Sequence, residues 1–377
     1  MSPKRPKAKG WCPGAYQPMM SGDGLVVRVR PVMARLTRDQ ALGLCELALE
    51  FGSGVMDLTS RANLQLRGVS PEDHETLLQR LNGLDLLPDD PELESRRNLL
   101  ISPQWTDGDI THQLATQLYD RLAEFPDLPA KMGFALDTGA VSVLQSQSAD
   151  FRFERNNDQL ILRADGASHG RVVTPENAIT AAIEMAQWFV NTGGARRKRM
   201  RHHLHQAALP NAWQALPAPQ HHAPDQPGKS ALGFYYGAAF GQLDAIQLSA
   251  LITATDSRAL RVTPWRLFLL EDAVPVPTSF ITKPSDPLLA ISACPGAPKC
   301  ASASVRTHEV ARALATKIQG PLHVSGCAKG CAHPRQCQTT LVGRNGAFDL
   351  VRNGLPWDEP LQSGLAPNDL IDRIGEL

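Results

Sequence analysis

The sequence predicts an α+β fold made of two related copies of one unit, arranged as two pseudo-symmetric lobes of mixed sheet packed with helices. Segments with strand alternation and segments with helical periodicity follow one another along the chain. Three stretches of the second half resemble stretches of the first half, in the same order. The chain has 377 residues, which is more than one ordinary core accommodates, so two or more domains are expected.

The first quarter of the chain alternates between strands and helices. Residues 24–33 alternate apolar and polar side chains as a half-buried strand does, and residues 55–69 are predicted to form a second strand. Helices are predicted at 37–52, with Thr37 as N-cap, and at 70–81. Polar side chains of the second strand share one face through the period of two; they are Arg61, Asn63, Gln65 and Arg67.

The region from residue 96 to residue 228 continues the pattern and then loses it. Strands are predicted at 96–103 and 132–139, helices at 109–124 and 175–191, and a hairpin at 151–166 around Asn156–Asn157. A basic run follows at 195–206. Residues 207–228 are rich in Ala and Pro without periodicity, which indicates a linker between the two halves.

An internal repeat relates the two halves. Residues 259–274 resemble 56–69, residues 288–296 resemble 98–103, and residues 339–354 resemble 151–166. A duplicated α+β unit with a ligand between its halves is the natural inference, since ligand sites favour domain interfaces.

Four cysteines dominate the second copy. They stand as C-x5-C and C-x3-C on either side of a stretch, 305–320, that reads as one helix; they are Cys294, Cys300, Cys327 and Cys331. Four thiolates brought together in this way suit an iron–sulfur cluster. Zinc sites have tighter pairs at both ends, and disulfide frameworks belong to small secreted domains. A structural zinc site and four ordinary buried cysteines remain as alternatives, and Cys12, Cys45 and Cys337 are not counted as ligands.

Composition excludes several classes of protein. The formal net charge is zero and the pI is near 7.2, so global charge does not favour nucleic-acid binding. The basic N-terminus precedes no apolar signal region, and the sequence contains no run of about 18 apolar residues that would span a membrane. Clustered cysteines without a signal peptide indicate a reducing cytoplasm.

The motifs resemble those of the sulfite and nitrite reductase superfamily across nearly the whole chain. The four cysteines carry the resemblance, together with LTSRANLQLRG (58–68) and RRNLLISP (96–103), which look like the TxRQxxQ and RN strands of that superfamily. It implies duplicated ferredoxin-like and sulfite-reductase-type units around a central tetrapyrrole site, with a [4Fe–4S] cluster on the four cysteines. The corresponding divisions are 1–20 (N-terminal arm), 21–95 and 96–206 (first repeat), 207–228 (linker), 229–286 (ferredoxin-like half of the second repeat) and 287–377 (cluster domain).

Within the superfamily, the chain is most similar to the precorrin-3B synthase family, through GWCPGAYQPMMSGDGLVVRVRP near the start and LRVTPWR later on. This resemblance implies an O2-dependent monooxygenase of aerobic cobalamin biosynthesis. Its substrate, precorrin-3A, would take the place of sirohaem and be hydroxylated at C20 with lactone formation. The resemblance also implies a mononuclear non-haem iron.

The expected substrate is a polyanionic disc, which calls for cations at its rim. Arg61 and Arg97 match tetrapyrrole-binding arginines of the superfamily, and Lys131 matches the first lysine of its K-x-K pair, whereas Gly133 replaces the second. This departure argues against an anion-reducing site. Three further candidates come from the residues themselves: Arg67, and from the basic run Arg197 and Arg199. No catalytic residue is identified.

The second iron and the electron donor are less well defined by the sequence. Iron sites often use two histidines and a carboxylate, but no pair of histidines has a convincing spacing; the candidates are His202, His203, His205, His308, His323 and His333. No Gly-x-Gly-x-x-Gly follows a strand, so a separate NAD(P)H-dependent reductase is expected to deliver electrons.

Two other functions remain open. A sirohaem-dependent sulfite or nitrite reductase would share the cluster and the arginines but would contain a haem. An iron–sulfur electron-transfer or sensor protein would bind nucleic acid through residues 195–206, with a strongly salt-dependent affinity. The neutral overall charge and the duplicated architecture argue against the second of these.

Overall fold

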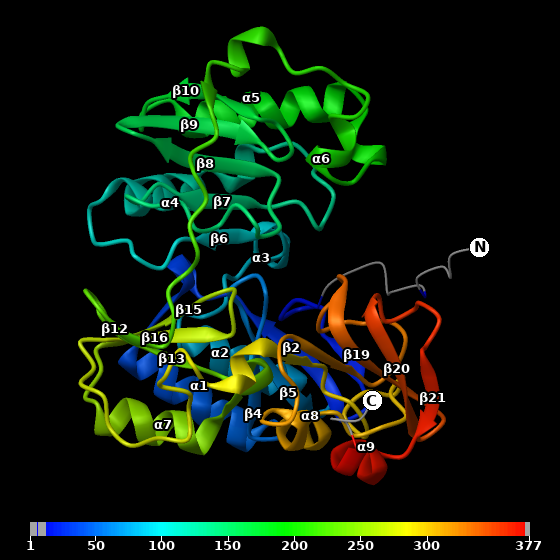
Figure 1. Ribbon diagram of the computed structural model, residues 1–377. Helices are drawn as coiled ribbons and strands as arrows, with labels where there is room; N and C mark the ends of the chain where they lie inside the picture. Colours follow the sequence, from blue (N-terminus) through cyan, green and yellow to red (C-terminus); the bar gives the residue numbers. More distant parts are fainter. Residues whose placement is uncertain (1–5, 7–12, 374–377) are drawn as a thin grey trace.

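The computed structural model describes residue 6 and residues 13–373, so Cys12 and most of the predicted N-terminal arm lie outside the described part (Figure 1). Four sheets form three bodies. Two sheets lie together at the base with helices α1, α2 and α7, a third forms the upper domain, and the fourth lies at the side of the base with α8 and α9. Among the described residues, no helix is both long and apolar enough to cross a membrane.

The first base sheet has the strand order β1-β2-β5-β4-β14. Helix α1 (Arg38–Glu50) begins at Thr37, whose hydroxyl accepts from the Gln40 amide while the Gln40 side chain accepts from Thr37, a capping box. Helix α2 is His74–Gly83. The strands are β1 (Met19–Ser21), β2 (Gly24–Val29), β4 (Val55–Leu58), β5 (Leu64–Val69) and β14 (Gln242–Asp244).

The second base sheet repeats this arrangement with the order β12-β13-β16-β15-β3. Its helix, α7 (Ala245–Ala254), is capped by Asp244. The strands are β12 (Gly228–Ser230), β13 (Gly233–Gly237), β15 (Ala259–Val262), β16 (Leu267–Glu271) and β3 (Arg35–Thr37). Each half therefore gives one strand to the sheet of the other: β14 pairs with β4, and β3 pairs with β15.

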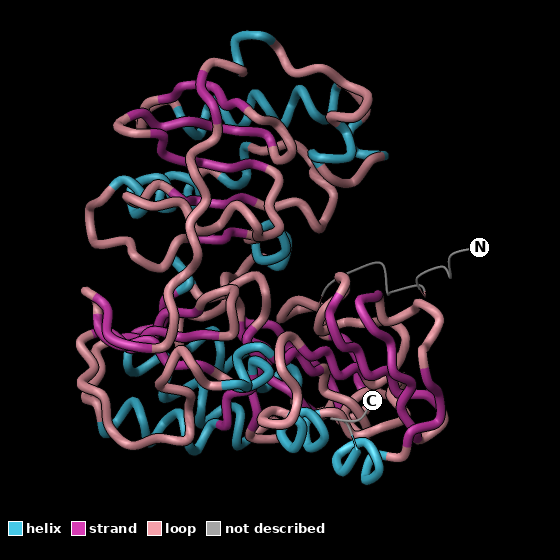
Figure 2. The backbone as a smooth tube through the Cα atoms, viewed as in Figure 1, coloured by secondary structure: helices cyan, strands magenta, loops and turns pink. Residues whose placement is uncertain are grey.

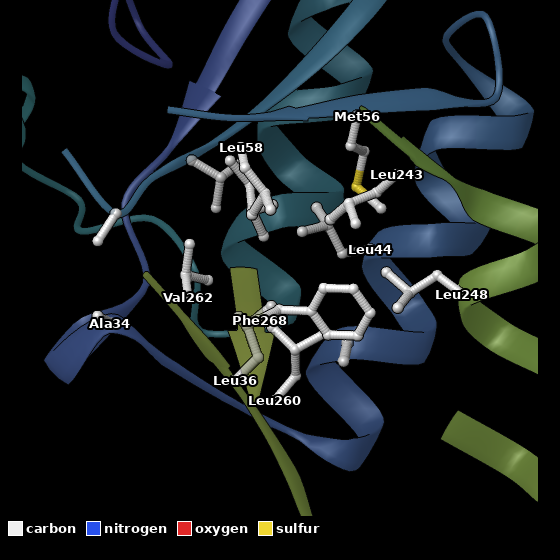
Figure 3. Close-up of a cluster of buried hydrophobic side chains, with 14 of the residues drawn as sticks. Ala34, Leu36, Leu44, Met56, Leu58, Leu243, Leu248, Leu260, Val262 and Phe268 are labelled. Carbon is white, nitrogen blue, oxygen red and sulfur yellow. The ribbon is translucent and has the colours of Figure 1, made fainter. Parts of the chain in front are cut away.

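One hydrophobic core fills the space between the two base sheets. Figure 3 shows side chains of both halves in contact there, including Leu36 and Leu44 from the first half with Leu243 and Phe268 from the second. All four are buried. The exchanged strands lie within this shared core, so the two ferredoxin-like halves are packed as one unit.

The upper domain is a six-stranded sheet with the order β11-β10-β9-β8-β7-β6. Strands β6, β7 and β8 are parallel, and β9 and β10 continue antiparallel. The strands are β6 (Leu99–Ile101), β7 (Phe134–Asp137), β8 (Phe151–Asn156), β9 (Gln159–Ala164), β10 (His169–Val173) and β11 (Leu216–Pro217). The helices are α3 (Pro91–Arg96), α4 (Ile110–Asp120), α5 (Ala178–Asn191) and α6 (Met200–His203).

The cysteine-bearing domain has the same topology. Strands β17, β18 and β19 are parallel, and β20 and β21 follow antiparallel. The elements are β17 (Ile291–Ala293), α8 (His308–Leu314), β18 (Leu322–Ser325), β19 (Cys337–Arg344), β20 (Ala347–Gly354), β21 (Gln362–Leu365) and α9 (Pro367–Arg373). Each of the three repeated stretches thus lies on equivalent strands, and the α+β fold with a duplicated unit is confirmed.

Several predicted elements differ from the structure. Residues 55–69 form a hairpin, β4 and β5, rather than one strand. Of the stretch 305–320 that was predicted to be one helix, only α8 (His308–Leu314) is helical. The helix predicted from residue 70 begins at His74, and α3 was not predicted. The predicted linker contributes β11 to the upper sheet and then runs as a loop down to the base (Figure 2).

Candidate functional site

The four cysteines of the predicted cluster lie on two neighbouring loops. Cys294 follows β17 directly and Cys327 comes shortly after β18. Because β17 and β18 are adjacent and parallel, both loops leave the same edge of the sheet. The C-x5-C pair therefore lies beside the C-x3-C pair, as the spacing predicts.

The backbone of these loops is suited to a bulky inorganic group. Gly296 and Gly330 have φ angles of 67° and 60°, a region that glycine occupies without steric cost. The Gly326 amide donates a hydrogen bond of 3.1 Å to the Cys294 sulfur. Amide hydrogen bonds to cysteine sulfur stabilise cluster thiolates and tune the cluster potential, so the donor set fits an iron–sulfur cluster.

The four thiols differ in exposure. Cys294 is buried, Cys300 and Cys327 are intermediate and Cys331 is exposed. Burial raises the pKa of Cys294, and negative charge on Cys331 and Cys300 raises it further, while amide hydrogen bonds oppose the rise. Bound iron would stabilise the thiolate form of Cys294, which burial alone disfavours.

A single-ion site is not formed by these cysteines. Within the described part of the chain, no group of three His, Cys, Asp or Glu side chains could hold one metal ion. A [4Fe–4S] cluster does not require such convergence, because each of its irons takes its own thiolate. Cys337 begins β19 and its thiol contacts the Pro321 carbonyl, so it lies apart from the two loops.

Two of the predicted tetrapyrrole-binding residues lie together. Arg61 is in the turn between β4 and β5, where the Thr59 hydroxyl accepts from the Arg61 and Asn63 amides. Its guanidinium donates 2.9 Å to the backbone carbonyl of Lys131, which comes just before β7. The structure thus joins the T-x-R turn of the base to the lysine segment of the upper domain.

Arg97 lies at the end of α3, beside the same domain junction. Its guanidinium donates to the Arg30 carbonyl at 3.2 Å and lies 5.3 Å from the centre of the Tyr119 ring. Tyr119 is on α4, and its hydroxyl accepts from the Met33 amide. Arg97 is therefore held by groups from both the base and the upper domain.

At Gly133, the position predicted to match the second lysine of the superfamily, the surroundings leave no room for a side chain. A Cβ atom there would lie 2.5 Å from the Asn98 carbonyl oxygen. The Gly133 amide donates to the Asp150 carboxylate at 3.2 Å, and its carbonyl accepts from the Asp150 and Phe151 amides. The position is fixed by backbone packing at the start of β7.

Arg67 is buried and has acceptors for all of its nitrogens. It forms ion pairs with Asp23 at 2.9 Å and with Asp57 at 3.2 Å, and it donates to the Lys299 carbonyl at 3.0 Å. Burial raises the pKa of Asp57, and the charge of Arg67 opposes that rise. Substrate binding by Arg67 stays a prediction. Its bond to the Lys299 carbonyl connects it to the loop that carries Cys300.

The arginines of the basic run are largely engaged within the upper domain. Arg199 pairs with Asp150 at 3.0 Å, Arg201 pairs with Asp165 at 3.2 Å, and Arg197 donates to Gln206. Asp150 also caps the start of α6 through the Met200 amide. Substrate binding by Arg197 and Arg199 stays a prediction.

Only two of the candidate histidines are brought together. The rings of His323 and His333 are 5.8 Å apart. His308 stacks on Phe240 and contacts Gln242, His203 is held by Thr192, and His202 and His205 are exposed. Sequence reasoning missed the polar partners of the first cysteine loop, Ser21 and Gly22, because nothing local marks contacts between such distant segments.

Comparison with known proteins identifies the fold and the family of the chain. Residues 17–84 match the nitrite/sulfite reductase ferredoxin-like half domain. The Mycobacterium tuberculosis NirA protein superposes with a TM-score of 0.62 at 17% identity, covering 93% of this chain and 79% of that one. The ferredoxin–nitrite reductase of Synechococcus elongatus is 22% identical over 97% of this chain and 88% of its own length. The chain thus has the fold of the nitrite and sulfite reductases, with a ferredoxin-like half domain at residues 17–84.

A nearer relationship is given by a precorrin-3B synthase of a Sinorhizobium species. It is 30% identical in an alignment of 417 residues that covers 98% of this chain and 88% of the relative. The chain belongs to the precorrin-3B synthase family. Since the relatives in both groups are enzymes, this protein is an enzyme of the oxidoreductase class.

Proposed function

We propose that the protein is a precorrin-3B synthase, which uses dioxygen to hydroxylate precorrin-3A at C20 with lactone formation in aerobic cobalamin biosynthesis. The relationship to the Sinorhizobium synthase over nearly the whole chain carries the proposal. The closed backbone at Gly133 supports it, because that position cannot hold the second of two lysines for a small anion.

A [4Fe–4S] cluster on Cys294, Cys300, Cys327 and Cys331 belongs to the proposal. When bound, it would store and relay electrons. The chain's own contribution is to hold the tetrapyrrole: Arg61, Arg97 and Lys131 would surround its carboxylates, because guanidinium groups bind carboxylates in a bidentate way. Arg67 and Arg199 are weaker candidates, since each already pairs with a carboxylate of the protein, and so is Arg197, whose guanidinium donates to the Gln206 side chain.

The reaction sets a requirement for partners. One oxygen atom of O2 enters the product and the other leaves as water, which takes two electrons from outside. The chain has no Gly-x-Gly-x-x-Gly segment for a nicotinamide. We therefore propose a separate NAD(P)H-dependent reductase as donor and a cytoplasmic location. The mononuclear non-haem iron that the resemblance implies is assigned no ligands, because no group of three His, Cys, Asp or Glu side chains among the described residues could hold it.

The alternative function is a sirohaem-dependent sulfite or nitrite reductase. Its support is the ferredoxin-like match and the resemblance to the Synechococcus nitrite reductase. An electron-transfer or nucleic-acid-binding sensor is less supported, because Arg199 and Arg201 of the basic run are paired with carboxylates of their own domain.

The test is the visible spectrum of protein purified without air, with iron and sulfide assays and mass spectrometry of precorrin-3A incubated with O2 and a reductant. A broad iron–sulfur shoulder and a product heavier by one oxygen atom are expected. Sharp haem bands would favour the alternative, and a folded protein without visible absorbance would contradict both. Cys300→Ser should abolish the shoulder, whereas Cys337→Ser, a matched change outside the loops, should leave it.

A further inference from the structure

One backbone carbonyl connects the N-terminal half with the first cysteine loop. The Lys299 carbonyl oxygen accepts from the Ser21 hydroxyl at 2.7 Å, from the Gly22 amide at 3.1 Å and from the Arg67 guanidinium at 3.0 Å. Ser21 ends β1, Gly22 begins the turn that leads to β2, and Arg67 is on β5. Three donors from another domain therefore converge on the residue just before Cys300.

Arg67 is itself held rigidly. Arg67 is only 5% exposed. Its guanidinium donates to both carboxylate oxygens of Asp23, at 3.0 and 2.9 Å, and to the carboxylate of Asp57 on β4 at 3.2 Å. A buried guanidinium bound to two carboxylates has little freedom to reorient, and removing one partner of such a group is costly. The orientation of the Arg67 guanidinium toward the Lys299 carbonyl is thus fixed by Asp23 and Asp57 of the base.

The contact between the turn and the loop leaves no spare space. A Cβ atom on Gly22 would meet the Pro298 carbonyl oxygen and would lie 3.1 Å from the Cys300 amide nitrogen. The Cys300 amide in turn donates to the Gly296 carbonyl at 2.8 Å. Because the Lys299 carbonyl and the Cys300 amide belong to one peptide unit, the three donors orient the backbone that carries Cys300.

We propose that Arg67 is a positioning residue for the cluster: through the Lys299 carbonyl, it holds the Cys294–Cys300 loop and thereby sets how firmly the cluster is retained and how easily it is reduced. The inference rests on the proposed cluster and assigns Arg67 to it instead of to the substrate. Partners that orient metal ligands affect retention strongly, typically by about 10-fold to 100-fold. A positive charge next to the loop also favours the reduced, more negative cluster.

The experiment uses the full-length protein, purified anaerobically, in wild-type form and as Arg67→Met, Arg67→Lys and Ser21→Ala. Two quantities are measured: the half-life of the visible absorbance after exposure to air and chelator, and the midpoint potential from a redox titration followed by electron paramagnetic resonance. Arg80→Met is the matched control, since Arg80 is a half-exposed arginine of α2 in the same half-domain that pairs with Glu50.

Arg67→Met is expected to shorten the half-life by about tenfold and to move the potential to more negative values. Arg67→Lys should restore part of both properties, Ser21→Ala should shorten the half-life to a smaller extent, and Arg80→Met should behave as wild type. Circular dichroism and melting curves report folding. If Arg67→Met does not fold, Ser21→Ala decides, because it removes one donor and leaves both ion pairs of Arg67 in place.

Two outcomes would overturn the inference. Folded Arg67→Met and Ser21→Ala proteins with wild-type half-life and potential would show that the loop does not depend on these donors. A wild-type protein without any cluster would remove the proposed function and this inference together, whereas the first outcome leaves the proposed function intact.

Discussion

At the scale of single residues, the cysteine-bearing domain contains a buried histidine, His323, whose protonation state is set by its burial. His323 is fully buried in the middle of β18, between Ser292 and Thr340 on the neighbouring strands. Neither of its ring nitrogens has a hydrogen-bond partner among the described residues. Burial, with a smaller effect from His333, lowers the pKa of His323 to about 3. The folded protein therefore holds this imidazole neutral.

This neutral state predicts a pH dependence of stability. In the unfolded chain a histidine has a pKa of about 6.5 and takes up a proton below that pH, whereas folded His323 does not. The unfolded state then binds more protons, so the free energy of unfolding should fall as pH drops from about 6.5 towards 3. Replacing His323 with Gln should flatten the dependence, measured by urea unfolding between about pH 7.5 and pH 5.

His169→Gln is the control, because His169 is exposed on β10. It should keep the wild-type slope of unfolding free energy against pH. Equal slopes in all three proteins would mean that His323 is protonated, or solvated, in the folded state.

The kind of site could be predicted from the sequence more easily than the contacts that its residues make. The cysteine spacing predicts that Cys294, Cys300, Cys327 and Cys331 are brought together across a helix, and the structure has the two pairs on neighbouring loops at one sheet edge. That these cysteines hold a cluster stays a prediction. The role of Arg67 could not be predicted in this way, because the Lys299 carbonyl is 232 residues away in sequence. A hydrogen bond to a backbone atom at that separation leaves no mark in local pattern or spacing.

At the scale of secondary structure, the hairpin β4–β5 shows where the alternation of apolar and polar residues fails to locate a turn. Residues 55–69 alternate like one strand, yet the chain turns at 59–63, where Ala62 adopts a φ of 51° and no glycine or proline marks the turn. The Thr59 hydroxyl organises this turn by accepting from the Asn63 amide, so a threonine that binds nearby backbone replaces the usual turn signal. In the second copy Thr263 accepts from the Trp265 amide in the same way, but there Pro264 also marks the turn.

The helices that follow the exchanged strands provide a matched pair of caps. Thr37 caps α1 and Asp244 caps α7, each through a hydrogen bond from the amide three residues on. Thr37→Ala and Asp244→Ala should each lower the free energy of unfolding by about 1 kcal/mol, because an orphan amide loses its acceptor. Chemical denaturation of the single and double variants tests this.

Because the two caps share no partner, the double variant should lose about the sum of the two single losses. Ser249→Ala, at a partly exposed position of α7 away from the cap, serves as control and should change stability little. A Thr37→Ala protein as stable as wild type would mean that packing of α1 against α7 alone fixes the start of the helix.

At the scale of the whole molecule, the exchange of β3 and β14 could not be predicted from the sequence. Strands of three residues carry no periodic signal, so the repeat indicated two lobes but not that they share strands and a core. The fold class and the order of the repeated strands were predicted correctly, because the repeated hairpins β8–β9 and β19–β20 have longer strands that keep their alternation.

The exchange predicts how a divided chain behaves. If the chain is cut between Ala223 and Pro224, in the segment that leads from the upper domain to β12, each fragment lacks the strand and half of the core that the other supplies. Coexpressed fragments should elute together in size-exclusion chromatography, and each alone should aggregate. Two separately soluble, folded fragments would contradict an obligatory shared core.

The reciprocal exchange of β3 and β14 also explains how one copy can have the four cysteines while the other copy lacks them. Two identical chains that swapped these strands would form a symmetric dimer, in which every substitution appears twice. Joined in a single chain, the copies vary independently while the shared core keeps them together. Cys294 follows β17 in one copy, and Ser102 occupies the matching place after β6 in the other. Broken symmetry thus gives the molecule one cysteine centre where a dimer would have built two.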